Sequence, residues 1–563
     1  MRIIFLLFGF LSFNFLSTAQ NFDWAIQYGD TNNEGSYASK VDLEGNIYTA
    51  GYFGGTVDFD PGLGTAFLTA TGEENVFVQK LDSAKGFVWA VRLSCDLKAR
   101  ASGLDVDDDG NVYVSGTFSG VIDLDPGSGM EVKTSNGELD VFAVKFDNIG
   151  TFVWGYNFGG SGKDKVRNIV VNSSQEVYTT GWFYDTVDFD PGVNSEEYIS
   201  NGMSDIFVLK IKPNGEFGWV NKIGGLKNDY PLSMDIGPGE NIYTTGAFYD
   251  TVDFDPGTGT DTKISVGVRD AFVQKTDANG NHIWVSTFGS SGYTDGWVIN
   301  IDNAGNVYSS GAFTDTVDFD PGTGNFNLFS NGFTDIYVQK LNSSGDFVWA
   351  RAVGGKQHDY GFSLDVDAYG NVYTGGRFQD TTDFNPGADT FILVNTGADA
   401  FIQKLSAAGD FEWAVKLGGE GSTTLTSLKL DNAGNIFSSG HFSLSSDFDT
   451  SSDTLLLTSK GGSDVFIHKM KTDIPVGISE FSFAEVLVYP NPSTGSYIVE
   501  LPEGQTQAQM RVVDTSGKLV YQKELSQTKT QIVMNDLPSG MYIINIQLNN
   551  GKTVYGKLLI NGN

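Results

Sequence analysis

A tryptophan that returns every 65 residues is the strongest constraint on how this chain folds. Successive members lie 65 residues apart, and the last follows after 64. The series is Trp24, Trp89, Trp154, Trp219, Trp284, Trp349 and Trp413. A fixed period of this kind is typical of repeat architectures, in which each repeat is one supersecondary unit. We therefore expect seven equivalent units over most of the 563 residues.

Other landmarks keep the same frame. A Gly-x-Phe element recurs at Gly51/Phe53, Gly116/Phe118, Gly181/Phe183, Gly246/Phe248, Gly311/Phe313, Gly376/Phe378 and Gly440/Phe442. A Val-Asp-Phe-Asp-Pro-Gly element follows it, as at 187–192, and then Asp-x-Phe-Val-x-Lys, as at 205–210. Gly and aromatic residues at regular spacing indicate an all-β repeat fold.

Each unit is predicted to hold four strands. In the second unit these are 104–107, 111–116, 140–146 and 152–158, with a tight turn at Asp108-Asp109-Gly110. The third strand is apolar on both faces, with Phe142 and Val144 on one face and Val141 on the other. A strand buried on both sides fits a propeller blade packed between two neighbours.

The order of the landmarks predicts how the array closes. The tryptophan marks a fourth strand, yet the chain begins with one around Trp24 and its repeats end with a third strand at 464–469. We therefore expect 21–28 to complete the last blade and close a seven-bladed β-propeller over residues 20–470. An open solenoid is the alternative and would need polar caps, which the sequence lacks.

These landmarks resemble the β-propeller repeat family of bacterial secreted proteins, whose units carry Gly-Asn-Val-Tyr, Gly-x-Phe and Asp-x-Phe-Val-x-Lys. The resemblance covers about residues 21–470. It implies a propeller and no common activity.

The first 19 residues are predicted to be a signal peptide. Arg2 supplies the positive start, 3–16 is mostly apolar, and Ser17-Thr18-Ala19 offers a small-residue cleavage site. The alternative, a membrane anchor, is disfavoured because Gly9, Ser12 and Asn14 interrupt a short apolar run. The mature chain is thus expected to have no transmembrane segment. Cys95 is the only cysteine, which excludes an intrachain disulfide.

A separate C-terminal domain is expected after a linker at 471–485. Residues 486–563 hold six Lys and Arg against five Asp and Glu, so the strong negative charge belongs to the repeats. Alternating apolar residues predict seven strands there at 487–489, 497–501, 510–514, 519–524, 530–534, 541–548 and 553–560. The pattern indicates a small β-sandwich.

This tail resembles the type A C-terminal sorting domain of the type IX secretion system. The matching motifs are Tyr489-Pro490-Asn491-Pro492-Ser493-Thr494-Gly495, Asp514-Thr515-Ser516-Gly517-Lys518 and Leu537-Pro538-Ser539-Gly540-Met541-Tyr542. The resemblance implies that residues 486–563 bind the secretion machinery. It also implies a protein secreted from, or held on the outer surface of, a Gram-negative bacterium. An ordinary carbohydrate-binding sandwich is the alternative.

Composition excludes several classes of partner and gives no support to catalysis. A net charge of -34 argues against nucleic acid and anionic lipid surfaces. The four histidines, His282, His358, His441 and His468, fall at different repeat positions, so no metal-ligand spacing appears. No catalytic motif is present. We expect no catalytic residue, no metal site and no cofactor, with calcium as the one alternative.

The calcium alternative rests on paired aspartates in the Val-Asp-Phe-Asp-Pro-Gly element. They are Asp58/Asp60, Asp123/Asp125, Asp188/Asp190, Asp253/Asp255, Asp318/Asp320 and Asp447/Asp449, with Asp383/Asn385 as a variant. Carboxylates at i and i+2 share one strand face and suit a hard cation. They equally suit capping of the Pro-Gly turn.

The middle residue of Gly-x-Phe varies inside an invariant frame, as Tyr52, Thr117, Trp182, Ala247, Ala312, Arg377 and His441. It lies near the end of the second strand, hence near the face with the long loops. We expect Tyr52, Trp182, Arg377 and His441 to rim a recognition surface for a sugar or peptide. Random drift of surface residues is the alternative.

The sequence therefore favours a non-catalytic binding or adhesion scaffold that recognises a glycan or a protein on the loop-rich face. The rival is a secreted carbohydrate-active or peptide-cleaving enzyme using Arg377 or His358, because a propeller fold alone excludes neither. A structural surface-layer component is a third interpretation.

Overall fold

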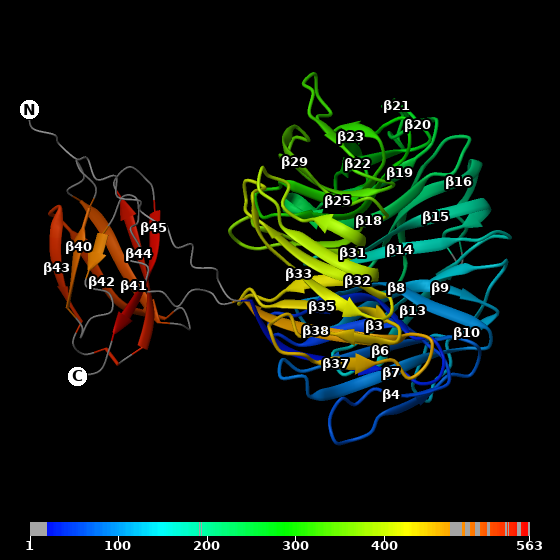
Figure 1. The fold of residues 1–563 in the computed structure, drawn as a ribbon, viewed down its shortest axis with the longest axis horizontal. Coiled ribbons are helices and arrows are strands. Elements are labelled where there is room, and N and C mark those ends of the chain that lie inside the picture. The colour runs from blue at the N-terminus through cyan, green and yellow to red at the C-terminus, as the bar shows by residue number, and fades with distance from the viewer. Residues whose placement is uncertain are drawn as a thin grey trace, which may run out of the picture. The chain divides into compact units, whose positions relative to one another are not determined.

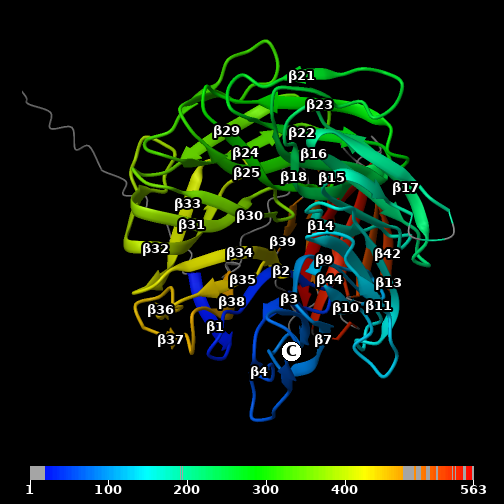
Figure 2. The same ribbon diagram turned by 90° about the vertical axis from the view of Figure 1, so that its right-hand side faces the viewer.

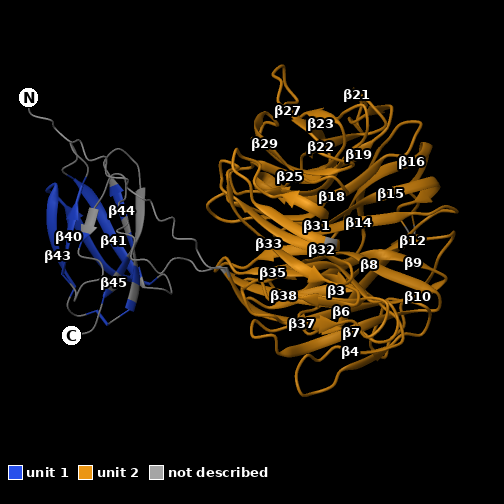
Figure 3. Ribbon diagram, in the orientation of Figure 1, with its two compact units in different colours: residues 1–18, 473–563 blue, residues 19–472 orange. Residues whose placement is uncertain are grey.

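The structure is a computed structural model that divides into two compact units, 19–472 and 473–563 with 1–18 (Figure 3). The structure describes residues 20–190, 192, 194–472, 487–489, 496–501, 507–514, 518–534, 537–538, 540–548 and 553–560. The predicted signal peptide at 1–19 and most of the predicted linker lie outside them. No helix in the described part of the chain is long and apolar enough to cross a membrane.

The larger unit is built of antiparallel sheets that follow one another along the chain, each with four long strands, and short strands extend the first and the sixth sheet to six strands (Figure 1). The first and second sheets are β2 (Gly35–Val41), β3 (Ile47–Phe53), β6 (Asn75–Leu81) and β7 (Phe87–Cys95), then β8 (Lys98–Val106), β9 (Val112–Ser119), β12 (Asp140–Phe146) and β13 (Phe152–Phe158). The third and fourth are β14 (Lys165–Val171), β15 (Val177–Asp188), β16 (Glu197–Ile211) and β17 (Phe217–Ile223), then β18 (Tyr230–Gly237), β19 (Asn241–Phe248), β22 (Asp270–Thr276) and β23 (His282–Phe288). The fifth and sixth are β24 (Thr294–Ile301), β25 (Val307–Phe313), β28 (Asp335–Leu341) and β29 (Phe347–Val353), then β30 (Tyr360–Val366), β31 (Val372–Asp383), β32 (Ile392–Leu405) and β33 (Phe411–Gly419).

The seventh sheet combines the two ends of this unit. It contains β34 (Thr423–Leu430), β35 (Ile436–Phe442), β38 (Asp464–Thr472) and β1 (Gln20–Tyr28). β1 pairs antiparallel with β38, with Tyr28 opposite Val465 and Asn21 opposite Lys471. In Figure 2 the blue β1 accordingly lies beside the gold β38. β38 continues to Thr472, two residues past the predicted end of the repeats.

Neighbouring sheets contact each other through their first strands. These contacts run in chain order through β2, β8, β14, β18, β24, β30 and β34, and β34 contacts β2 again. The apolar clusters follow the same order, each filled from two adjacent sheets. The cluster that joins the seventh sheet to the first includes Val465 and Ile467 from β38 and Ile47 and Phe77 from the first sheet. All four are at most 1% exposed.

The described residues confirm the all-β class, with one 3-10 turn, η1 (Pro238–Glu240). β12 and β13 have the predicted bounds, and Gly110 adopts the positive φ of 79° that the tight turn requires. An extra pair of short strands, which was not predicted, lies in the long second-to-third connection of five sheets. These ribbons are β4 (Thr56–Asp58) with β5 (Phe67–Thr69), β10 (Val121–Asp123) with β11 (Val132–Thr134), β20 (Thr251–Asp253) with β21 (Thr262–Ile264), β26 (Thr316–Asp318) with β27 (Asn327–Phe329), and β36 (Ser445–Asp447) with β37 (Leu456–Thr458).

The smaller unit contains two antiparallel sheets. One is β39 (Leu487–Tyr489), β40 (Ser496–Glu500) and β43 (Lys529–Val533), and the other is β42 (Leu519–Leu525), β41 (Ala508–Asp514), β44 (Gly540–Leu548) and β45 (Thr553–Ile560). Val499, Met510 and Ile544 are among the side chains that form its buried core. Of the predicted motifs, 490–495, 515–517 and Ser539 lie outside the described residues.

Candidate functional site

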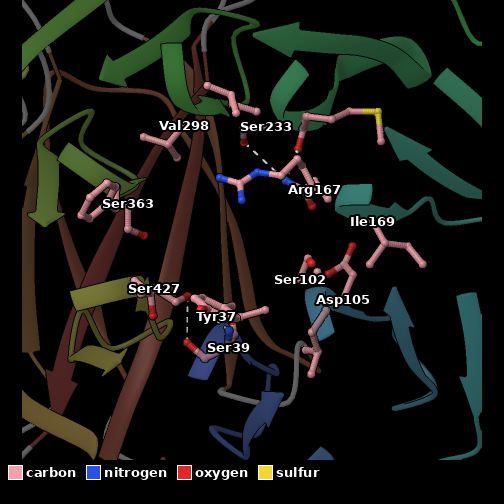
Figure 4. Close-up of a pocket in the computed structure, with 18 of the residues that line it drawn as sticks. Tyr37, Ser39, Ser102, Asp105, Arg167, Ile169, Ser233, Val298, Ser363 and Ser427 are labelled. Atoms are coloured by element: carbon pink, nitrogen blue, oxygen red, sulfur yellow. Dashed lines mark hydrogen bonds between the residues drawn. The ribbon is translucent and has the colours of Figure 1, made fainter. Parts of the chain in front are cut away.

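The first strands of all seven sheets line one cavity of about 830 Å³ in the larger unit. Figure 4 shows Tyr37, Ser102, Arg167 and Val298, which come from four different sheets, around the same open space. Because each sheet contributes the same strand, equivalent repeat positions face one another across the cavity. The character of this cavity is therefore set by the residues that differ between repeats.

A β-bulge in every first strand turns one variable side chain into the cavity. The pairing of the first with the second strand skips one residue in each sheet, and a bulge of this kind re-aims a side chain. The skipped residues, called the bulge residues below, are Tyr37, Ser102, Arg167, Leu232, Trp297, Phe362 and Thr426, and all of them line the cavity.

The invariant glycine of Gly-x-Phe explains why the bulge is possible. A Cβ atom on Gly181 would overlap the carbonyl oxygen of Lys165 on the bulged strand, and one on Gly376 would overlap that of Tyr360. The glycine thus permits a close approach of two backbones. The next residue, x, pairs with the first-strand residue two positions before the bulge residue, as Trp182 does with Lys165.

Two of the four predicted recognition residues line the cavity, and the other two contact aromatic side chains of first strands. Trp182 and His441 line the cavity. Tyr52, 8% exposed, lies behind Tyr37, with the two rings stacked and their centroids 5.8 Å apart. Arg377 holds its guanidinium 5.6 Å from the centre of the Tyr360 ring.

Two basic side chains of the third sheet, Lys165 and Arg167, line this cavity, and neither has an acidic partner among the described residues. Lys165 Nζ lies 5.7 Å from the centre of the Trp182 ring, and Arg167 Cζ lies 5.7 Å from that of Trp297. Among the described residues neither forms an ion pair, whereas the neighbouring Arg100 binds the Glu74 carboxylate with Nη2 at 2.7 Å. Burial, reinforced by nearby cations, lowers the pKa of Lys165, and burial also lowers that of Arg167.

Several buried polar atoms near this cavity have no hydrogen-bond partner in the described structure. They are Trp297 Nε1, Arg377 Nε and His441 Nδ1. Burial lowers the pKa of His441 to about 4, with a smaller contribution from Arg377, so its imidazole is neutral at neutral pH. Buried polar atoms without partners are costly, which makes them candidates to be completed by a ligand.

Three carboxylates near the C-terminal ends of these first strands already accept hydrogen bonds from the protein. Asp105, Asp235 and Asp365 lie at one repeat position in alternate sheets, and each accepts a backbone N–H from the next sheet. The three bonds are Val171 N to Asp105 Oδ2 at 2.9 Å, Ile301 N to Asp235 Oδ2 at 2.8 Å and Leu430 N to Asp365 Oδ2 at 2.8 Å. Asp105 also binds Lys40 Nζ at 2.7 Å. These groups hold neighbouring sheets together.

The paired aspartates of the repeat stabilise a turn by accepting hydrogen bonds from its backbone N–H groups. Asp318 Oδ1 accepts the N–H of Asp320 at 3.1 Å and that of Phe326 at 2.7 Å, and Asp320 Oδ1 accepts that of Gly322 at 2.8 Å. The other six copies repeat this pattern. Within the described ranges, no group of three or more His, Cys, Asp or Glu side chains is placed to hold a metal ion.

His358, which was one of the two residues named for the rival enzyme, does not line this cavity. Its Nδ1 is 2.9 Å from Thr334 Oγ1, and its ring stacks on Phe333 with centroids 5.2 Å apart. The bulge residues were not predicted, because no landmark marks the first strand. Their one signal was variation at a fixed repeat position, two residues after the residue that pairs with x.

Two curated proteins show sequence similarity. An uncharacterized WD repeat-containing protein, L264, of Acanthamoeba polyphaga mimivirus is 23% identical over 76% of this chain and 36% of its own length. The ulvan lyase NLR42 of Nonlabens ulvanivorans is 29% identical over 15% of this chain and 16% of its own. The chain thus spans about a third or less of the length of these relatives.

Two solved structures of the extracellular domain of BT4673 from B. thetaiotaomicron align with the chain. One, described as a putative hybrid two component system, is 8% identical, covers 95% of this chain and 99% of its own, and has a TM-score of 0.20. The other, described as a putative one component system, is 11% identical, covers 94% and 81%, and has a TM-score of 0.17.

A family model described as a secretion system C-terminal sorting domain matches residues 487–561. This range coincides with the two sheets of the smaller unit and with the motifs that begin at Tyr489. The smaller unit is therefore a C-terminal sorting domain, and it directs the protein through the type IX secretion system to the cell surface or the extracellular space.

Proposed function

We propose that the exported protein is a non-catalytic binding or adhesion scaffold that holds a glycan or protein ligand in the cavity between the first strands. The observation that carries the proposal is the set of variable side chains that seven β-bulges turn into one space. The frame around them is constant, and the variable side chains are aromatic or basic on several sheets, as in Tyr37, Arg167 and Trp297. Rigid aromatic side chains with a few polar groups are typical of ligand pockets.

The scaffold is proposed to be a closed seven-bladed β-propeller. The pairing of β1 with β38 supports closure, as do the bonds between the first strands of the seventh and first sheets. Closure removes the two unpaired sheet edges that an open array would expose. It also fixes the seven first strands around one space, which is what a shared binding site requires.

Binding is preferred over catalysis because the acidic groups of the cavity are engaged. Asp105, Asp235 and Asp365 accept backbone N–H groups, and His358 faces Thr334 and Phe333 outside this cavity's lining. General acid–base catalysis needs titratable groups free to exchange a proton with the substrate.

The test is a glycan array together with a peptide pull-down on the full chain. We expect a ligand whose affinity falls about tenfold or more in Trp182→Ala, because aromatic anchors carry much of the binding energy at such sites. Tyr369→Ala is the matched control, since this 86% exposed aromatic lies in the turn between β30 and β31. No ligand in either assay, or equal losses in both variants, would overturn the proposal.

A further inference from the structure

We propose that the ligand is an acidic saccharide, whose carboxylate or sulfate group binds Lys165 and Arg167 while its sugar rings stack on Trp182 and Trp297. This inference rests on the proposed function and narrows its ligand. It is drawn from the charges, ring contacts and buried polar atoms of this cavity.

The charge balance of the cavity favours an anionic ligand. The chain carries -34 overall, yet Lys165 and Arg167 gather in the third sheet without an ion-pair partner among the described residues. Lys163 and Arg100 lie close enough to Lys165 to contribute to the lowering of its pKa. A half-buried cation without a counter-ion is unfavourable unless a ligand supplies one. An anionic ligand would reduce the repulsion between these cations and offset the cost of their desolvation.

The Arg167 side chain extends to a residue of another sheet. Arg167 belongs to the third sheet, but its guanidinium lies over Trp297 of the fifth sheet. Figure 4 shows the Arg167 side chain extending from its strand into the open space of the cavity. A planar guanidinium presented in this way can bind a carboxylate or a sulfate through two parallel N–H donors. Trp297 Nε1, which has no hydrogen-bond partner among the described residues, belongs to a side chain that lines the same cavity.

The aromatic side chains favour a sugar over other anions. Trp182 and Trp297 each lie beside a cation, and the Trp297 ring packs edge-on against Phe362 with centroids 5.5 Å apart. Aromatic planes suit the apolar faces of sugar rings and leave the ring hydroxyls free. A free inorganic anion would use the cations alone. A cavity of about 830 Å³ is within the size range of pockets that enclose small organic ligands, so a short chain or a chain end fits.

The experiment compares charged and neutral partners of one backbone on the full chain. The probes are an oligogalacturonate and its carboxyl-reduced neutral form, a sulfated galactan oligomer and its desulfated form, and oligoglutamate. We expect the uronate, the sulfated oligomer, or both to bind at least about tenfold more tightly than their neutral forms. We also expect binding to weaken as salt increases.

Variants locate the contact. Arg167→Gln and Lys165→Gln should each weaken acidic-saccharide binding about tenfold or more, and Arg167→Lys should retain part of it. Lys212→Gln is the control, because this 53% exposed side chain lies in the turn between β16 and β17. Thermal melts of all variants establish that each is folded.

The outcomes separate this inference from the function it rests on. Equal binding of charged and neutral saccharides overturns the acidic ligand and leaves the binding scaffold intact. Binding of oligoglutamate without any saccharide also overturns it, in favour of an acidic peptide. Failure of every probe, together with an empty glycan array and pull-down, overturns both proposals.

Discussion

The side-chain oxygens of Ser39 on β2 and Ser427 on β34 lie 2.9 Å apart, although the residues are 388 positions apart in the chain. The N–H of Ser39 also donates to Ser427 Oγ at 3.2 Å. Between the sixth and seventh sheets the N–H of Leu428 donates to Ser363 Oγ at 2.8 Å, in the same way. The junction between the two ends of the array thus uses the same contact as an internal junction.

A disulfide across β1 and β38 tests this junction. In Asn21→Cys/Lys471→Cys the two thiols sit at directly paired positions, so a disulfide is expected to form and to add at least about 3 kcal/mol to the free energy of unfolding. The cross-linked chain should migrate faster on a non-reducing gel. Cys95, the native cysteine, is buried, and each single variant serves as a control. Failure to cross-link under oxidising conditions would contradict the pairing.

The repeat frame made much of this fold predictable. Third strands such as β12 have apolar residues on both faces, and the tight turns carry Gly at the position of positive φ. Both are local signals, so they identify strands and turns. The bulges are not local, because a bulge depends on the register of two strands and the skipped residue differs in every sheet, as Arg167 and Trp297 do.

The candidate site was therefore predictable only in part. Trp182 and His441 were found because an invariant Gly and Phe flank each of them. Tyr37 and Arg167 were not found, because they lie among varied first-strand residues with no landmark. Whether Lys165 and Arg167 have an acidic partner depends on side-chain positions from several sheets, which no single segment of sequence specifies, and none is present in the described part of the chain.

Stability should rise as the pH falls from 8 to about 5. Burial raises the pKa of Asp335 to about 7 and that of Asp359 to about 6, above the ordinary value of 3.8. The folded state therefore binds protons that the unfolded state lacks in this range, and lowering the pH favours folding until the unfolded carboxylates also become protonated. Melting temperatures measured at intervals from pH 8 to pH 5 will show this slope.

Asp335→Asn should flatten that slope. The first repeat already carries an amide here, Asn75, whose Oδ1 accepts the N–H of Thr71 at 2.9 Å. Removing the buried charge is expected to add roughly 1–3 kcal/mol to the free energy of unfolding at pH 8, with little gain at pH 5. Asp108→Asn, at an exposed turn, is the control. Parallel curves for the wild type and Asp335→Asn would refute this assignment.

The carboxylate of Asp365 is expected to hold the sixth and seventh sheets together. Asp365→Ala leaves the N–H of Leu430 without its acceptor and should lower the free energy of unfolding by about 1–3 kcal/mol. Asp365→Asn keeps an acceptor oxygen and should remain within about 1 kcal/mol of the wild type. Denaturant titration distinguishes the two. Equal losses in both variants would mean that the charge, rather than the hydrogen bond, matters.

Chelation should leave the protein unchanged, because the paired aspartates already bind backbone N–H groups. We expect equal melting temperatures with EDTA and with millimolar calcium. Asp318→Ala, which removes the acceptor of two N–H groups, should cost about 1–3 kcal/mol, whereas Asp318→Asn should cost less. A calcium-dependent rise in melting temperature that Asp318→Asn abolishes would instead establish a metal site.

As the pH rises, the affinity for an acidic saccharide should begin to fall below the pH at which an ordinary lysine loses its charge. The pKa of Lys165 is lowered by burial and by the nearby Arg167, Lys163 and Arg100, so the free protein loses this charge below the pH at which an ordinary lysine does. An anionic ligand favours the charged form, so binding is strongest below that pKa and weakens as the pH rises through it. Lys165→Arg keeps the charge and should remove the alkaline decrease, which calorimetric titration between pH 7 and pH 10 will measure. Lys212→Arg should leave the profile as in the wild type, and an unchanged profile in Lys165→Arg would show that Lys165 does not face the anion.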